Sequence, residues 1–253
     1  MEKVGEEWRK SWKKVQINYN YPQEIQNAIL LCPDFFALIT KYVKKRGLIL
    51  EAGCGYGIKC LCFNRIYNAS CIGIDIVVEP LKTLTSYLNV TNHDTAPLAS
   101  DVTYIPFKDD IFDVVTSFGV IEHFRKKSEI LQFLNDVSRV LKKDGFLILT
   151  IPNFASTFRN KLYLALSKRR FGIYHKPYTM SSLASIFNSS PLKPVEIGFI
   201  SFGFHQLALK VRFNDKLVYF LYHAVWKILC LFTQVLHENY LDPIYVIAKK
   251  AGT

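Results

Sequence analysis

An acidic residue and three glycines stand together in the stretch LILEAGCGYG. An apolar run ends at Glu51, and Gly53, Gly55 and Gly57 follow at every second position. Glycine lets a backbone turn tightly and approach a ligand closely, and a helix after the turn presents free N–H groups. A dinucleotide site favours G-x-G-x-x-G, but Ile58 stands where the third glycine belongs. By itself the turn fits a nucleotide-like ligand or an ordinary loop, and a dinucleotide is disfavoured.

Two further acids follow apolar segments. Asp75 ends CIGID, and Asp101 comes directly after APLAS. A carboxylate at the end of a second strand can accept hydrogen bonds from both hydroxyls of a ribose. An acid that caps a helix beside an ordinary glycine turn is the structural alternative.

Two segments carry side chains that can move a proton. Glu122 and His123 lie in IEHF, just past a predicted strand, where hydrogen bonding at a helix start is the alternative role. His175 and Tyr178 lie in YHKPYT, where an exposed loop histidine is the simpler interpretation. All four are candidate catalytic residues.

Strands and helices alternate through the middle of the chain. Strands are predicted at 47–53, 71–75, 96–100, 112–119 and 146–153, and helices at 57–67, 79–90 and 128–145. The last helix is expected to begin in a capping box at Ser128 and to stop at Gly145. This alternation predicts a parallel, doubly wound sheet, in which ligands bind beyond the carboxyl ends of the strands.

The N-terminal region is predicted to be helical. Trp8 and Trp12 are one helical turn apart, Tyr19 and Tyr21 are expected in a loop, and a second helix is predicted over 34–45. No apolar secretory signal is visible. Six cysteines without paired C-x-x-C spacing indicate reduced cytoplasmic thiols and no structural zinc.

Four segments, in this order and spacing, resemble the class I S-adenosylmethionine-dependent methyltransferases: EAGCGYG, CIGID, SDVTYIPFKDDIFDVVTS and RVLKKDGFLILTIPN. The resemblance implies a Rossmann-like, doubly wound seven-stranded sheet with helices on both faces. Its C-terminal antiparallel strand pair would come from 194–202 and 243–250. The predicted domains are a helical cap over 1–46 and a methyltransferase domain over 47–253, with substrate-side insertions at 154–190 and 204–241.

The resemblance also implies S-adenosylmethionine as cofactor and a role for each matching acid. Glu51 would lie near the methionine amino group, Asp75 would hold the ribose, and Asp101 the adenine amino group. The other residues implied at the cofactor are Gly53, Cys54, Gly55, Gly57, Ile76, Val102, Ser117 and Phe118. A sulfonium cation with an ammonium group suits a pocket lined by acids.

Some quinone O-methyltransferases carry a similar Leu-Glu-His segment, preceded by an acid that helps to bind a divalent metal. Gly119 stands at the corresponding position here, so no metal is predicted.

Two features bear on the acceptor. Residues 145–195 contain no Asp or Glu but seven Lys or Arg, which suggests a phosphate-bearing or membrane-surface substrate rather than a merely solvated face. The net charge of +11 also favours anionic partners. The apolar segment 217–236 approaches the length of a membrane span, but Lys227 lies at its middle. We expect a helix that is buried, in a dimer contact or at a membrane interface.

The leading hypothesis is a methyltransferase acting on oxygen of a small or lipid-linked acceptor, such as a glycan or a quinone. It would be cytoplasmic, with a peripheral contact at the inner membrane face. An RNA methyltransferase is the alternative indicated by the pI of 9.3, although no RNA-binding appendage is recognisable. A third reading is a non-catalytic cofactor-binding or membrane-docking protein. An NAD oxidoreductase is disfavoured by Ile58.

Overall fold

The computed structural model describes residues 6–9, 19–153, 174–200 and 243–250. The predicted segment 217–236 and most of the two predicted insertions lie outside the described residues.

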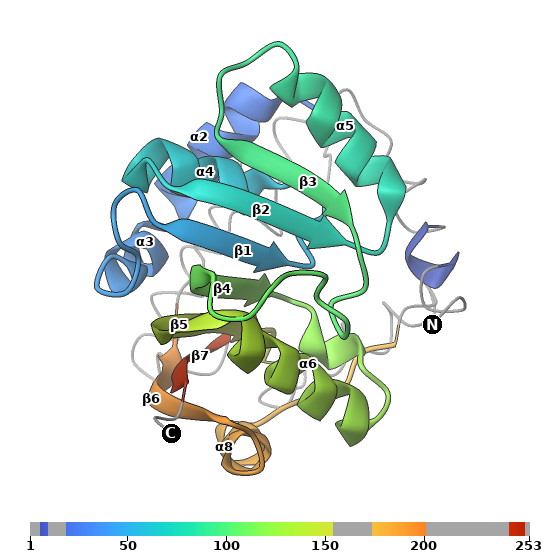
Figure 1. Ribbon diagram of the computed structural model, residues 1–253, viewed down its shortest axis with the longest axis vertical. Coiled ribbons are helices and arrows are strands. Elements are labelled where there is room, and N and C mark those ends of the chain that lie inside the picture. The colour runs from blue at the N-terminus through green and yellow to red at the C-terminus, as the bar shows by residue number, and fades with distance from the viewer. Residues whose placement is uncertain (1–5, 10–18, 154–173, 201–242, 251–253) are drawn as a thin grey trace, which may run out of the picture.

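Seven strands of the described chain form one sheet in the order β3-β2-β1-β4-β5-β7-β6 (Figure 1). The strands are β1 (Leu48–Ala52), β2 (Ser70–Asp75), β3 (Thr95–Ala99), β4 (Phe112–Phe118), β5 (Leu141–Ile151), β6 (Leu192–Phe199) and β7 (Ile244–Lys250). The first five run parallel, and β7 is antiparallel to both β5 and β6. The predicted fold class, including its C-terminal antiparallel strand pair, is therefore confirmed.

Helices cover both faces of the sheet (Figure 1). They are α2 (Tyr21–Leu31), α3 (Pro33–Ile39), α4 (Ile58–Tyr67), α5 (Val78–Leu88), α6 (Lys127–Val140) and α8 (Met180–Asn188), with a short 3₁₀ helix, η1 (Ile121–His123). Buried residues of α2, α3 and α4 share one core cluster, and those of α6 and α8 share another.

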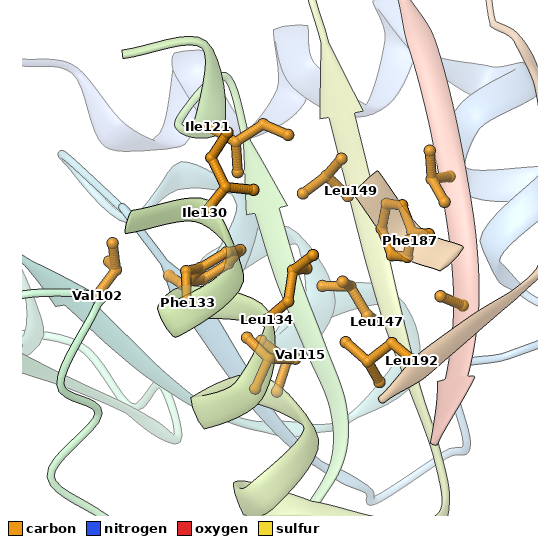
Figure 2. Close-up of a cluster of buried hydrophobic side chains, with 14 of the residues drawn as sticks. Val102, Val115, Ile121, Ile130, Phe133, Leu134, Leu147, Leu149, Phe187 and Leu192 are labelled. Carbon is orange, nitrogen blue, oxygen red and sulfur yellow. The ribbon is translucent and has the colours of Figure 1, made fainter. Parts of the chain in front are cut away.

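Neighbouring residues of the central strands point into opposite cores. Ile49 joins the cluster under α4, whereas Leu50 joins the cluster under α6, and both are fully buried. Figure 2 shows the second cluster, where Leu134 of α6 lies against Val115 and Leu147 of the sheet. Because side chains alternate along a strand, a sheet with two covered faces requires the continuous apolar runs found in the sequence.

The predicted N-terminal elements need two corrections. Tyr21 does not lie in a loop but begins α2, a helix that was not predicted. Asn20 caps this helix by accepting a hydrogen bond from the Gln23 N–H at 3.2 Å. The helix predicted over 34–45 is α3, which begins at Pro33 and ends at Ile39.

The predicted helix over 128–145 is wrong at both ends. It begins at Lys127, with Lys126 as its N-cap residue, and it ends at Val140. Leu141 instead begins β5, where it is fully buried and pairs with Phe112. Strand pairing and burial of Leu141 therefore override the local preference of LKKDG for helix.

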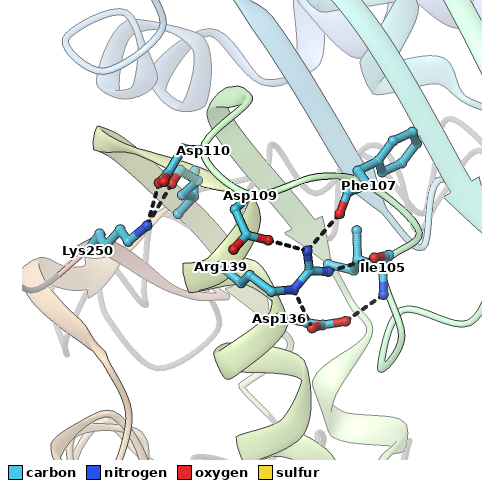
Figure 3. A network of polar contacts seen from close by, with 8 residues as sticks. Ile105, Phe107, Asp109, Asp110, Asp136, Arg139 and Lys250 are labelled. Carbon is cyan, nitrogen blue, oxygen red and sulfur yellow. Dashed lines mark hydrogen bonds and ion pairs between the residues drawn. The ribbon is translucent and has the colours of Figure 1, made fainter.

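Arg139 on α6 fixes the loop that joins β3 to β4 (Figure 3). Its guanidinium donates to the carbonyls of Phe107 and Ile105 at 2.7 and 2.8 Å and to Asp109 at 2.9 Å. Asp136, which pairs with Arg139 at 3.1 Å, accepts from the Ile105 N–H at 2.6 Å. This network holds the chain that follows Asp101.

Candidate active site

A cavity of about 420 Å³ lies beyond the carboxyl ends of β1, β2 and β4. The strand order reverses between β1 and β4, so the cavity occupies the switch point where doubly wound sheets bind ligands. Most of the residues predicted at the cofactor line it: Glu51, Gly53, Cys54, Gly55, Asp75, Ile76, Asp101, Val102 and Phe118. Gly57 and Ser117 are not among the lining residues, and of the four catalytic candidates only His123 lines it.

Packing against neighbouring side chains, and not only the approach of a ligand, requires the glycines of the turn after β1. Gly53 has a φ of +81°, and a Cβ added there would lie 2.4 Å from Val120 Cγ2. Gly57 has a φ of +70°, and its added Cβ would lie 2.4 Å from Leu84 Cδ2 on α5. Both glycines are therefore required by the close approach of neighbouring side chains.

Glu51 is a buried carboxylate at the end of β1. Its Oε2 accepts from both the N–H and the thiol of Cys60, each at 2.9 Å. Burial raises the pKa of Glu51 to about 7, against the opposing effect of these hydrogen bonds and of Lys59. A cation bound beside Glu51 would stabilise its ionised form.

Asp75 ties the glycine turn to the end of β2. Its Oδ2 accepts from the Gly55 N–H at 2.8 Å, and its Oδ1 accepts from the Val77 N–H at 2.9 Å. Burial raises its pKa, although three backbone hydrogen bonds oppose the shift. Each carboxylate oxygen has a second lone pair that a ribose hydroxyl can use.

Asp101 lies after β3 on the same side of the sheet. Its Oδ1 accepts from the N–H and the hydroxyl of Thr103 at 2.8 and 2.7 Å. These contacts fix the carboxylate at the cavity wall. Three carboxylates from three strand ends thus fit a ligand that combines a cation with ribose and adenine groups.

Ser117 does not line the cavity, and its side chain makes a structural hydrogen bond instead. Its hydroxyl is buried and donates to the Ala52 carbonyl at 3.1 Å, between β4 and β1.

His123 is the predicted base that reaches the cavity. Its Nδ1 lies 2.7 Å from the Tyr174 carbonyl. A carbonyl oxygen can only accept, so Nδ1 carries the proton and Nε2 keeps its lone pair. Burial lowers the pKa of His123 to about 4, which keeps the imidazole neutral near pH 7. Trp8 and His175 pack edge-on against this ring, with centroids 4.7 and 4.5 Å away.

Glu122 lies beneath His123, with its Oε1 3.7 Å from His123 Nε2. The side chain is fully buried, and its Oε2 has no hydrogen-bond partner among the described residues. Burial raises the pKa of Glu122 to about 8. Tyr178 is also buried and donates to the Ile121 carbonyl at 3.4 Å, so it packs behind η1. In the described ranges no group of three His, Cys, Asp or Glu side chains could hold a metal ion.

Eleven further lining residues were not predicted as site residues, and they include Trp8, Tyr19, Tyr56, Lys59 and Arg125. Tyr19 stacks on Tyr56 of the glycine turn, with centroids 4.1 Å apart. Lys59 follows the turn by two residues, a spacing that could have indicated it. Trp8 and Tyr19 come from distant segments, so no local pattern could place them here.

Residues 50–149 match the family model described as a methyltransferase domain. The matched part of the chain is therefore a methyltransferase domain, and its seven-stranded sheet is the one expected from the resemblance to class I S-adenosylmethionine-dependent methyltransferases. The cofactor of this class is S-adenosylmethionine.

Three relatives place this domain among known sequences. An uncharacterized protein of Methanocaldococcus jannaschii is 28% identical over 64% of each chain. The methyltransferase YcgJ of Bacillus subtilis, also uncharacterized, is 30% identical over 40% of this chain and 39% of the relative. An mRNA cap guanine-N(7) methyltransferase of Eremothecium gossypii is 31% identical over 50% of this chain and 32% of the relative. The chain thus spans less than two thirds of each relative.

Two solved structures share the fold. A Haloferax volcanii protein in complex with the Trm112 methyltransferase activator has a TM-score of 0.63 at 13% identity, covering 91% of this chain and 93% of its own. Geranyl diphosphate C-methyltransferase of Streptomyces coelicolor has a TM-score of 0.60 at 12% identity, covering 87% and 76%.

Proposed function

We propose that the protein is an S-adenosylmethionine-dependent methyltransferase that acts on an oxygen of a small or lipid-linked acceptor, of the glycan or quinone type. The choice of oxygen rests on His123, a neutral imidazole in the wall of the cavity. A hydroxyl acceptor must lose a proton during transfer, so a base in the wall is useful. An acceptor nitrogen with a free lone pair has no such need.

The cofactor, when bound, supplies a methyl group on a sulfonium centre. Glu51 would meet its ammonium group, Asp75 its ribose hydroxyls, and Asp101 its adenine. Tyr19 and Trp8 add apolar wall, which helps to exclude water from the reacting groups.

His123 Nε2 is the atom that we assign to receive the acceptor proton. The hydrogen bond from Nδ1 to the Tyr174 carbonyl orients the ring and partly stabilises the imidazolium that forms. Glu122, 3.7 Å from Nε2, acts as a positioning residue. When it ionises, its charge favours the protonated imidazole, so His123 becomes a stronger base as pH rises through about 8.

The acceptor class rests on charge and on residues beyond the site. The acid-free segment 145–195 supports a phosphate-bearing or membrane-surface substrate. The apolar segment 217–236 would provide a peripheral contact with the inner membrane face. Among the described helices none is long and apolar enough to cross a membrane.

An RNA methyltransferase is the second candidate. The net charge of +11 and the similarity to an mRNA cap guanine-N(7) methyltransferase favour it. Methylation of a ring nitrogen would not use His123 as a base. The two candidates therefore differ in their dependence on this residue.

The test is transfer of isotopically labelled methyl groups into lipid, metabolite and RNA extracts, read by mass spectrometry. We expect a labelled hydroxyl compound in the lipid or metabolite fraction. His123→Asn keeps an N–H donor for Tyr174 but removes Nε2, and it should slow transfer by about 10²–10⁴-fold. His93→Asn is the matched control, because His93 bonds with Asn64 and is not among the residues that line the cavity. Labelled RNA, or full activity of His123→Asn, would contradict the proposal.

A further inference from the structure

At the edge of the cavity, a carboxylate of the N-terminal segment forms an ion pair with a guanidinium. Arg125 Nη2 lies 3.2 Å from both carboxylate oxygens of Glu7. Arg125 lines the cavity, and its side chain is 48% exposed, so a ligand can reach it. A guanidinium binds carboxylates and phosphates through the same paired geometry.

Tyr174 links this guanidinium to the candidate base. The Tyr174 carbonyl accepts a hydrogen bond from His123 Nδ1 at 2.7 Å. The centroid of the Tyr174 ring lies 5.1 Å from the guanidinium carbon of Arg125. A ring face attracts a guanidinium and restricts its orientation. An anion bound by Arg125 would therefore lie beside the wall that carries His123.

The segment that carries Glu7 also touches His123. Trp8 packs edge-on against the His123 ring at 4.7 Å. In Figure 1 the described turn 6–9 lies on the side to which the parallel strands point. Glu7 thus reaches Arg125 from beyond the strand ends, where an acceptor must also enter.

Other acids near Arg125 have different partners. Glu129 lines the cavity, but its Oε2 accepts from the backbone N–H groups of Arg125 and Lys126, each at 2.9 Å. In the described part of the chain, Glu7 is the carboxylate that pairs with the Arg125 guanidinium.

We propose that Arg125 binds an anionic group of the methyl acceptor, a phosphate or a carboxylate, and that Glu7 occupies this position until the acceptor arrives. The proposal rests on the proposed function, because it names the substrate class of the same cavity. The nearby cations Lys126, Lys127 and Lys176 add to the attraction for an anion.

The experiment measures binding of pyrophosphate, and separately of citrate, to the full chain by calorimetry at matched ionic strength. Arg125→Gln should weaken binding of the preferred anion by about tenfold or more, as expected for a lost charged hydrogen-bond pair. Glu7→Gln removes the competing carboxylate and should tighten binding about two- to fivefold, since exposed ion pairs are weak. Preference for pyrophosphate would identify a phosphate-bearing acceptor, and preference for citrate a carboxylate-bearing one.

Two controls have matched changes elsewhere. Lys142→Gln removes one positive charge at the start of β5, at the end of the sheet opposite the cavity. There Lys142 pairs with Asp113. Asp144→Asn removes one negative charge from an exposed acid that pairs with Lys249. Both should leave anion binding unchanged.

Four results would overturn the proposal. If Lys142→Gln weakened anion binding as much as Arg125→Gln, the attraction would be nonspecific. If Arg125→Gln left anion binding unchanged, Arg125 would not be the anion site. Equal tightening by Asp144→Asn, or no tightening by Glu7→Gln, would remove the competition. S-adenosylmethionine binding is measured on the same samples. Its absence from the wild-type chain would contradict the proposed function, whereas the anion titrations decide the role of Arg125 independently.

Discussion

The half of the cavity that we assign to the cofactor and the half that we assign to the acceptor are built in different ways. The cofactor half consists of Glu51, the turn 53–57 and Asp75. Backbone N–H groups of neighbouring segments fix the carboxylates of Glu51 and Asp75. The acceptor half joins segments 6–9, 121–125 and 174–178, which are far apart in the sequence. They meet through side-chain contacts and through a hydrogen bond from the Lys176 N–H to the Glu122 carbonyl at 2.6 Å. Strand ends of one sheet impose the first arrangement, while only tertiary packing brings the second together.

The comparison predicts that the cofactor half has little tolerance for change. Asp75→Ala removes the acceptor of the Gly55 and Val77 N–H groups and the predicted ribose contact. S-adenosylmethionine binding should weaken by about 100-fold or more, since several hydrogen bonds to a charged group are lost. Calorimetry measures the affinity, and thermal unfolding confirms that the variant folds. Asp144→Ala, at an exposed acid paired with Lys249, is the control and should bind normally.

The acceptor half should respond to pH through Glu122 without a change in cofactor affinity. Its pKa is raised to about 8, so the carboxyl is neutral below that pH and ionised above it. Ionisation favours protonation of His123, so the rate of methyl transfer should rise about tenfold through pH 8. Glu122→Gln keeps the shape of the side chain but cannot ionise, and it should flatten this rise. An unchanged pH profile in Glu122→Gln would remove the assigned role.

The cofactor half should instead respond to pH through its binding affinity. The pKa of Glu51 is raised to about 7 in the free protein. A cationic ligand prefers the ionised carboxylate, so S-adenosylmethionine affinity should be full above pH 7 and fall up to tenfold per pH unit below it. Glu51→Gln should weaken binding and abolish this dependence. Cys60→Ala removes the thiol that stabilises ionised Glu51, and it should move the midpoint to higher pH.

The smallest effect concerns stability of the glycine turn. Gly53→Ala places a Cβ 2.4 Å from Val120 Cγ2 at a φ of +81°, so it should lower the free energy of unfolding by about 1–3 kcal/mol. Denaturant titration measures the loss. The double change with Val120→Ala should recover the part due to the clash but not the part due to backbone strain. Full recovery would show that the positive φ is without cost.

The sequence predicted those site residues whose positions depend on local secondary structure. Glu51, Asp75 and Asp101 each follow an apolar strand segment, and the sheet places such positions together. The helix α2 also has a recognisable start signal in Asn20 and Pro22, although Tyr21 was predicted to lie in a loop.

The acceptor half could not be derived in the same way. The contact of Glu7 with Arg125 spans 118 residues, and that of His123 with Tyr174 spans 51. The early end of α6 likewise depends on pairing of Leu141 with a strand 29 positions before it. Such contacts leave no periodicity or motif in a single sequence.

The most direct test of the central claim is calorimetric titration of S-adenosylmethionine into the wild-type chain and His123→Asn at pH 8, followed by labelled methyl transfer with the same two proteins. We predict saturable binding of one cofactor per chain with equal affinity in both, and transfer only in the wild type at an appreciable rate. Absence of cofactor binding to the wild-type chain would contradict the account, as would loss of binding in His123→Asn, because the two halves of the cavity would then not be separable.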